Sequence, residues 1–209
     1  YRYQAIKYLK PDKKNKYKKA DMISVQLAKI MKTLLVKRID SSFYAFKQSL
    51  KRYYNANQIM LNMFEKGTIY IAPNLKVNEL LSEDKKEDLI KLIEEARDTD
   101  PTIEICTPND FVEGFKDGIE ADNIILKELV KLWDEVDSDP KLDIFIDYLR
   151  TRLFDKEINQ EGKLVIFSES KETTKYLSDS LRENGFDHIL TVQSDNRDTQ
   201  MPILLANFD

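Results

Sequence analysis

The sequence predicts a mainly α-helical protein with long helices and a short parallel β-sheet near its C-terminal end. Apolar residues recur at helical spacing through most of the 209 residues. The pattern changes at residues 164–167, where Leu, Val, Ile and Phe form an unbroken apolar run typical of a strand covered on both faces. A helical pattern and a second predicted strand, residues 188–193, follow. Strand, helix and strand at this spacing predict parallel strands joined by a right-handed crossover.

Composition limits the kinds of site that the chain can build. With one cysteine, Cys106, and one histidine, His188, it cannot supply the Cys and His ligands of a structural zinc site. No disulfide can form within the chain, which favours a reducing compartment, and we expect the cytoplasm. No apolar run is long enough for a membrane span, and the five glycines form no phosphate-cradling loop.

Charge is distributed unevenly along the chain. Residues 1–60 hold 15 Lys and Arg against 3 Asp and Glu, whereas residues 61–160 hold 13 against 25. A basic block followed by an acidic block predicts an N-terminal segment that meets a polyanion. The alternative is a basic face that pairs with acidic residues of the same fold.

Two amphipathic helices are expected before residue 66, over residues 22–36 and 40–65, because apolar residues step by three and four in both. Another face of the second helix carries Lys47 and Lys51 beside Tyr44. Lysine and arginine neutralise phosphates, so the candidate nucleic-acid-binding residues of this part are Lys37, Arg38, Lys47 and Lys51.

Residues 66–138 read as a short strand followed by acidic helices. The β-branched run after Gly67 predicts a short edge strand or extended segment. Acidic amphipathic helices are expected over residues 84–98 and 119–136. Adjacent carboxylates such as those of Glu94 and Glu95 point apart on a helix, so we interpret them as solvated faces and not as an acid/base or metal site.

The C-terminal part begins with a well-marked helix. Asp139 is the expected N-cap, with Pro140 at the first helical position. A later helix over residues 171–184 ends at Gly185, which suits the left-handed conformation that follows many helices. Thr173 lies on the inner face of that helix.

A candidate binding edge lies where the first predicted strand ends. Ligands bind open α/β sheets at the carboxyl ends of the strands, and the amides of a helix N-terminus favour an anion such as a backbone phosphate. The residues placed there are Ser168, Glu169, Ser170 and Lys171. Ordinary helix capping explains the same residues equally well.

Three stretches occur in a recognisable order: DPKLDIFIDYL (139–149), GKLVIFSESKETTKYLSDSL (162–181) and LANFD (205–209). This order resembles the opening of the second RecA-like lobe of superfamily-two helicases, in particular the Swi/Snf-related ATP-dependent translocases. The positions that match are Asp139, Lys141, Leu142, Val165, Ile166, Phe167, Ser168, Thr173 and Leu181. The stretch LLVKRIDSSFYAFKQSL (34–50) is similar to the basic element that closes the first lobe, through Lys37, Arg38, Ser41, Ser42 and Phe43.

The resemblance implies a parent that hydrolyses ATP with Mg²⁺ and moves along DNA, or along RNA, with no membrane involved. It implies three parts: residues 1–66 as a basic segment with the exit of lobe one and a bridging helix, residues 67–138 as an acidic helical insertion, and residues 139–209 as the start of the C-terminal helicase lobe. The family's nucleotide-binding motifs and arginine finger are absent from these residues. We therefore expect a fragment that is inactive alone and binds no cofactor.

A function from a different class is also open. The chain then is a non-enzymatic helical scaffold with a small α/β cap, and the acidic helices over residues 84–98 and 119–136 are its docking surface for a protein partner.

Overall fold

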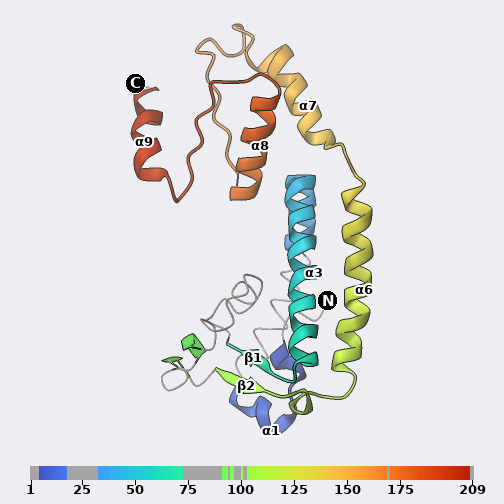
Figure 1. Cartoon of the computed structure of the whole chain (residues 1–209). Helices are drawn as coiled ribbons and strands as arrows, with labels where there is room; N and C mark the ends of the chain where they lie inside the picture. Colours follow the sequence, from blue (N-terminus) through green and yellow to red (C-terminus); the bar gives the residue numbers. More distant parts are fainter. Residues whose placement is uncertain are drawn as a thin grey trace. The chain divides into compact units, whose positions relative to one another are not determined.

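The structure is a computed structural model, and it describes residues 5–17, 33–72, 91–93, 95–96, 100, 103–168 and 170–207. These residues are mainly helical and contain one small sheet (Figure 1). The predicted mainly α fold class is therefore confirmed. The predicted helices over residues 22–36 and 84–98 lie largely outside the described residues.

Contacts divide the chain into two compact units. Unit 1 consists of Tyr1–Val36 and Lys47–Glu135, and unit 2 consists of Lys37–Phe46 and Val136–Asp209. Each unit is thus assembled from two separate stretches of sequence. The proposed division of a parent protein at residues 66 and 138 stays a prediction.

Unit 1 contains two long helices. They are α3, Phe43–Glu65, whose first residues belong to unit 2, and α6, Phe115–Asp134. Both arise from the amphipathic patterns expected for residues 40–65 and 119–136. The two helices lie side by side (Figure 1), and the buried side chain of Asn57 donates a hydrogen bond of 2.9 Å to the backbone carbonyl of Ile119.

The main core of unit 1 is built from segments far apart in the sequence. The 3₁₀ turn η1, Ala5–Tyr8, contributes Ala5 and Ile6, and the end of α3 contributes Met63 and Phe64. Phe111 and Phe115 join them, and the Phe115 ring stacks on Tyr8 with centroids 4.4 Å apart. The remaining N-terminal elements are α1, Pro11–Lys14, and the 3₁₀ turn η2, Asn15–Tyr17.

The sheet of unit 1 is a two-stranded antiparallel ladder. Strand β1, Ile69–Ile71, pairs with β2, Glu104–Cys106, with Ile69 opposite Cys106. β1 lies where the sequence predicted a short strand, and it follows Gly67, whose φ of 73° ends α3 in the left-handed conformation. β2 was not predicted.

Glu104 of β2 is a buried carboxylate with partners from the N-terminal segment. It accepts hydrogen bonds from the Lys13 ammonium at 2.8 Å and from the Tyr17 hydroxyl at 3.3 Å. Burial, followed by the nearby Glu104 charge, raises the pKa of Tyr17 above its ordinary value. This triad attaches residues 11–17 to the sheet.

Besides the helical residues 37–41 and the start of α3, unit 2 contains three helices within the described residues. α7, Pro140–Tyr148, continues into a π-helical turn, Leu149–Leu153, and α8, Lys171–Glu183, and α9, Arg197–Ala206, follow. Ile146, Leu149 and Leu181 form the buried centre of this unit.

The ends of these helices follow the predicted signals. Asp139 caps α7, its carboxylate accepting a hydrogen bond of 3.4 Å from the amide of Leu142, and Pro140 occupies the first turn. Gly185, with φ of 88°, follows the end of α8, as predicted. α9 was not predicted.

The predicted parallel sheet in unit 2 is wrong. Residues 162–168 and 188–193 belong to no strand, and the only ladder among the described residues is the antiparallel one in unit 1. An apolar strand covered on both faces needs neighbouring strands, and residues 164–167 have none in the described part: all four side chains are exposed, Phe167 to 91%. The second segment is attached instead to α8 by side chains, including a 3.1 Å hydrogen bond between the Ser178 and Thr191 hydroxyls.

Candidate nucleic-acid interface

The candidate site is built around the N-terminus of α8 in unit 2. Ser170 is the N-cap residue, and its hydroxyl accepts a hydrogen bond of 3.4 Å from the amide of Thr173. Ser168 adds an outer turn, because its hydroxyl accepts a hydrogen bond of 3.3 Å from the amide of Ser170. The remaining amides of the first turn carry the positive end of the helix dipole, a setting that favours an anion.

Arg38 joins this helix end from a distant part of the chain. Its guanidinium donates hydrogen bonds to the Ser170 hydroxyl at 2.6 Å and to the Glu172 carboxylate at 3.2 Å. The Arg38 and Glu172 side chains are 33% and 32% exposed, so solvent screens the ion pair only in part. Because Glu172 offsets its charge, we interpret Arg38 as the residue that attaches residues 37–46 to α8.

Further contacts attach residues 37–46 to the rest of unit 2. The Asp139 carboxylate accepts a hydrogen bond of 3.3 Å from the amide of Phe43, and the Lys141 ammonium donates to the carbonyl of Asp40. The rings of Tyr44 and Tyr176 stack with centroids 4.7 Å apart and planes 5° from parallel. The basic element before α3 is therefore fixed against both α7 and α8.

Residues 193–195, at the end of the second predicted strand, also lie at the N-terminus of α8. Gln193 donates a side-chain hydrogen bond of 3.5 Å to the carbonyl of Lys171, and the Lys171 ammonium lies 3.5 Å from the Asp195 carboxylate. These two charged side chains are 58% and 67% exposed, so the pair is weak and Lys171 can exchange Asp195 for another anion. The ends of both segments thus meet at α8 although no ladder joins them.

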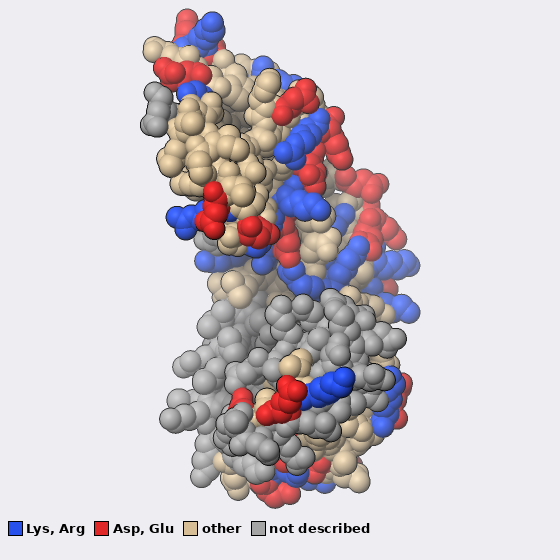
Figure 2. Space-filling view, turned by 60° about the vertical axis from the view of Figure 1, so that its left-hand side comes forward, with Lys and Arg blue, Asp and Glu red and all other residues tan. Residues whose placement is uncertain are grey.

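Two of the predicted basic residues do not belong to this site. Lys47 and Lys51 lie in unit 1, and the Lys51 ammonium pairs with the Asp134 carboxylate at 2.8 Å. The Lys13 ammonium likewise pairs with the Glu104 carboxylate. Both ion pairs join a lysine of the basic block to a carboxylate of the acidic block, as the alternative explanation of the charge distribution predicts. Figure 2 shows Lys and Arg interspersed with Asp and Glu over the surface in view.

The remaining predicted residues occupy different positions around α8 or in the segment attached to it. Lys37 is exposed beside Arg38, and the Thr173 hydroxyl is a buried group without a hydrogen-bond partner in the described structure. Glu169 lies outside the described residues. A nucleic-acid role for the set of nine residues stays a prediction.

Sequence reasoning missed Glu172, Gln193 and Asp195. Glu172 directly follows the predicted edge residues, but its partner Arg38 is 134 residues away and local patterns do not reveal it. Gln193 is the last residue of the second predicted strand and Asp195 follows it, so the rule that selected Ser168 at the end of the first strand also selects them.

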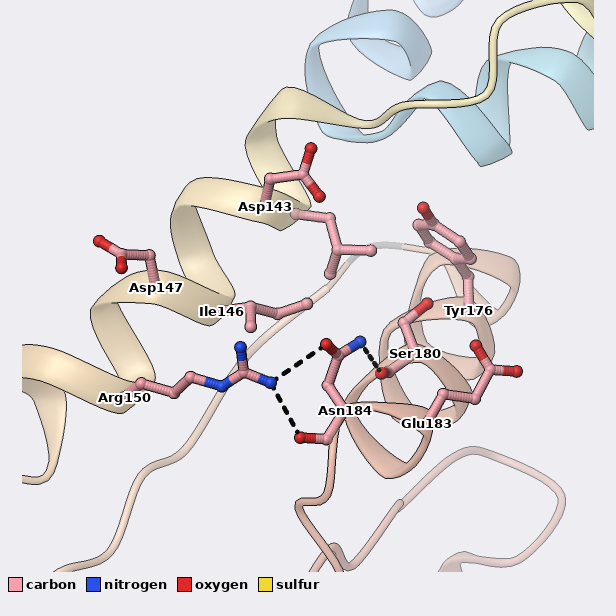
Figure 3. Close-up of a pocket in the computed structure, with 9 residues that line it drawn as sticks. Asp143, Ile146, Asp147, Arg150, Tyr176, Ser180, Glu183 and Asn184 are labelled. Atoms are coloured by element: carbon pink, nitrogen blue, oxygen red, sulfur yellow. Dashed lines mark hydrogen bonds between the residues drawn. The ribbon is translucent and has the colours of Figure 1, made fainter.

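A pocket of about 440 Å³ lies elsewhere in unit 2, between α7 and α8 (Figure 3). The Arg150 guanidinium donates hydrogen bonds of 3.1 and 3.2 Å to the backbone and side-chain oxygens of Asn184. Three carboxylates, those of Asp143, Asp147 and Glu183, also line the pocket. This acidic lining disfavours a phosphate, and none of the predicted site residues contributes to it.

Tyr176 gives unit 2 a predicted sensitivity to alkaline pH. Burial and then the hydrogen-bonded Asp139 carboxylate raise the pKa of Tyr176 to about 12 from an ordinary value of 10.0. The folded state therefore holds this proton more tightly than the unfolded state, so its contribution to stability is complete below pH 10 and is lost as the pH rises through about 12. We expect Tyr176→Phe to reduce the fall in stability over this range, measured by hydrogen exchange of the α8 amides. An equally steep fall in the variant contradicts this assignment.

Comparisons with protein families, curated proteins and solved structures gave no match. Within the described ranges, no group of three or more His, Cys, Asp and Glu side chains is arranged to hold a metal ion. Over the same residues, no helix combines the length and apolar character needed to cross a membrane.

Proposed function

We propose that the chain is part of a cytoplasmic ATP-dependent nucleic-acid translocase of the Swi/Snf type, with unit 2 as the beginning of its C-terminal RecA-like lobe. The observation that carries the proposal is the segment 164–167. Four consecutive apolar residues lie exposed in a non-helical stretch, and within the described structure their backbone groups make no hydrogen bonds. Such a run has the composition of an inner strand, but no neighbouring strand pairs with it in the described structure. In the proposal, the rest of the C-terminal lobe supplies these neighbouring strands.

The contact of Arg38 with Ser170 supports the same proposal. It joins the two stretches that resemble the exit of the first lobe and the opening of the second. In the proposed translocase, the end of lobe one is thereby attached to the helix that meets the nucleic-acid backbone.

The proposed role of this helix end is to hold phosphates while the parent moves. Lys171 supplies a solvent-accessible cation, and the amides of the first turn of α8 supply donors. The five glycines form no phosphate-cradling loop, and within the described residues no group of three or more His, Cys, Asp and Glu side chains could hold a metal ion. We therefore assign no step of hydrolysis to this chain.

Lys171→Ala in the intact parent tests the phosphate contact. We expect the DNA concentration for half-maximal ATPase stimulation to rise by about threefold to tenfold, and the slope of log affinity against log salt to fall by about 0.9, the value for one phosphate contact. Lys175→Ala is the matched control, because Lys175 is exposed one turn later on the same helix. Equal stimulation in both variants contradicts the assignment, and a response to RNA in place of DNA identifies the substrate.

The second candidate is a non-enzymatic helical protein-interaction module. It is favoured by the apolar side chains that α6 exposes, of which Ile125 is 60% and Leu132 is 50% exposed. The complete reading frame separates the two candidates. Nucleotide-binding motifs upstream and an arginine-finger motif downstream support the translocase, and their absence supports the module.

A further inference from the structure

An exposed apolar stripe runs along the second half of α6. Ile125, Leu129 and Leu132 are 60%, 36% and 50% exposed, and they follow one another at intervals of four and three residues. This spacing places the three side chains on one face of the helix, about 10 Å long at 1.5 Å per residue. The core-facing residues Phe115, Ile119 and Leu126 lie on a different face.

The spacing is that of the contact positions of a coiled coil. With Ile125 and Leu132 at d and Leu129 at a, the e positions fall on Leu126 and Trp133, which are buried or half-buried in unit 1. The apolar stripe is therefore continuous with the packed side of the helix. Only its other flank, the g side, faces solvent.

The solvent-facing flank is acidic. Both g positions are glutamates, Glu128 and Glu135, and both are exposed. Neither forms an ion pair with any residue in the described structure. Lys131 lies between them in sequence but farther around the helix from the stripe, so an incoming helix meets the two carboxylates first.

Pairing of α6 with the α6 helix of a second copy of the chain does not suit this surface. In an antiparallel pair of α6 helices the glutamates of one copy face those of the other, which is repulsive. In a parallel pair they face the e positions, Leu126 and Trp133, which offer no positive charge and are already packed in unit 1.

We propose that the stripe of Ile125, Leu129 and Leu132 docks an amphipathic α-helix of a partner protein, with Lys or Arg beside its own apolar stripe. The apolar residues supply the buried contact, and Glu128 and Glu135 select the charge of the partner. The inference depends on α6 alone and is independent of the proposed translocase activity.

A pair of designed helical peptides tests the proposal on the full chain. Both have three heptads with Leu at a and d, and they differ only at e and g, which are all Lys in one and all Glu in the other. Fluorescence polarisation of the labelled peptides measures binding. We expect the chain to bind the Lys peptide about tenfold more tightly than the Glu peptide, with the preference declining as salt rises.

Variants separate the apolar from the electrostatic contribution. Ile125→Ser with Leu132→Ser should abolish binding of the Lys peptide, whereas Ile124→Ser should not, because Ile124 is 70% exposed and lies off the stripe. Glu128→Lys with Glu135→Lys should reverse the preference between the peptides. Circular dichroism verifies that each variant keeps its helical content.

Three results overturn the proposal. The first is no binding of the Lys peptide, and the second is equal binding of both peptides at low salt. The third is a concentration-dependent dimer in analytical ultracentrifugation that Ile125→Ser with Leu132→Ser disrupts, because that result assigns the stripe to self-association.

Discussion

Replacing Phe115 with alanine is expected to lower the free energy of unfolding of unit 1 by about 3–5 kcal/mol. Phe115 is 2% exposed at the start of α6. Its ring stacks on Tyr8 at 4.4 Å and on Phe111 at 5.3 Å, and its edge meets Phe64 at 5.7 Å. The substitution leaves a cavity at the point where the N-terminal turn, the end of α3 and the start of α6 meet.

Trp133 makes this prediction simple to measure. It is the only tryptophan of the chain and lies in α6 of unit 1, so its fluorescence during urea denaturation reports this unit. Ile124→Ala is the matched control in the same helix, because Ile124 is 70% exposed and its truncation should cost less than about 0.5 kcal/mol. If Phe115→Ala shifts the midpoint no further than the control, the aromatic cluster does not stabilise unit 1 as described.

Replacing Asp139 with alanine should destabilise unit 2 by about 2–4 kcal/mol. Loss of an N-cap costs about 1 kcal/mol, and leaving a buried donor without an acceptor costs about 1–3 kcal/mol more. Asp139 is 7% exposed, and its carboxylate serves the amides of Leu142 and Phe43 as well as the Tyr176 hydroxyl. One side chain therefore connects α7, α8 and the segment before α3.

Two further variants separate these roles. Asp139→Asn keeps a capping oxygen but loses an acceptor, so it should cost less than Asp139→Ala. Asp137→Ala changes an exposed carboxylate two residues earlier and should have little effect. Hydrogen exchange over residues 171–183 measures the stability of unit 2. Equal protection in Asp139→Ala and Asp137→Ala would show that Asp139 does not connect these elements.

Local signals in the sequence predicted most helices of the fold. The stripe of residues 40–65, the cap at Asp139 and the glycine after α8 each depend on residues only a few positions apart, and the structure has all three. α9 escaped prediction because Pro202 lies within it, and proline disfavours a helix interior.

Features that depend on distant partners were not predictable in this way. β2 holds Glu104, an unusual residue for a buried strand, which is tolerated because Lys13 and Tyr17, 91 and 87 residues away, supply its partners. The apolar run 164–167 has the composition of an inner strand, but a strand needs neighbours that its own residues cannot specify.

The candidate site also combines features that local sequence predicts with features that depend on distant partners. The capping role of Ser170 follows from its position before a helix, so local sequence was enough to identify it. Arg38 was selected as a cation for phosphates, and its partners Ser170 and Glu172 could not be inferred because they lie more than a hundred residues later. Lys51 likewise finds Asp134 across the sequence.

The two stretches of unit 2 are separated in the sequence by residues 47–135 of unit 1, and this order has a consequence for protein synthesis. All residues of unit 1 have been synthesised once the ribosome reaches residue 135. Arg38 can pair with Glu172 only after another part of unit 2 is made, because Glu172 is synthesised 134 residues after Arg38. At about 5–20 residues per second, the ribosome takes on the order of ten seconds to supply that partner. We therefore expect nascent chains to complete unit 1 first, while residues 37–46 wait for the α7 and α8 surfaces on which they pack.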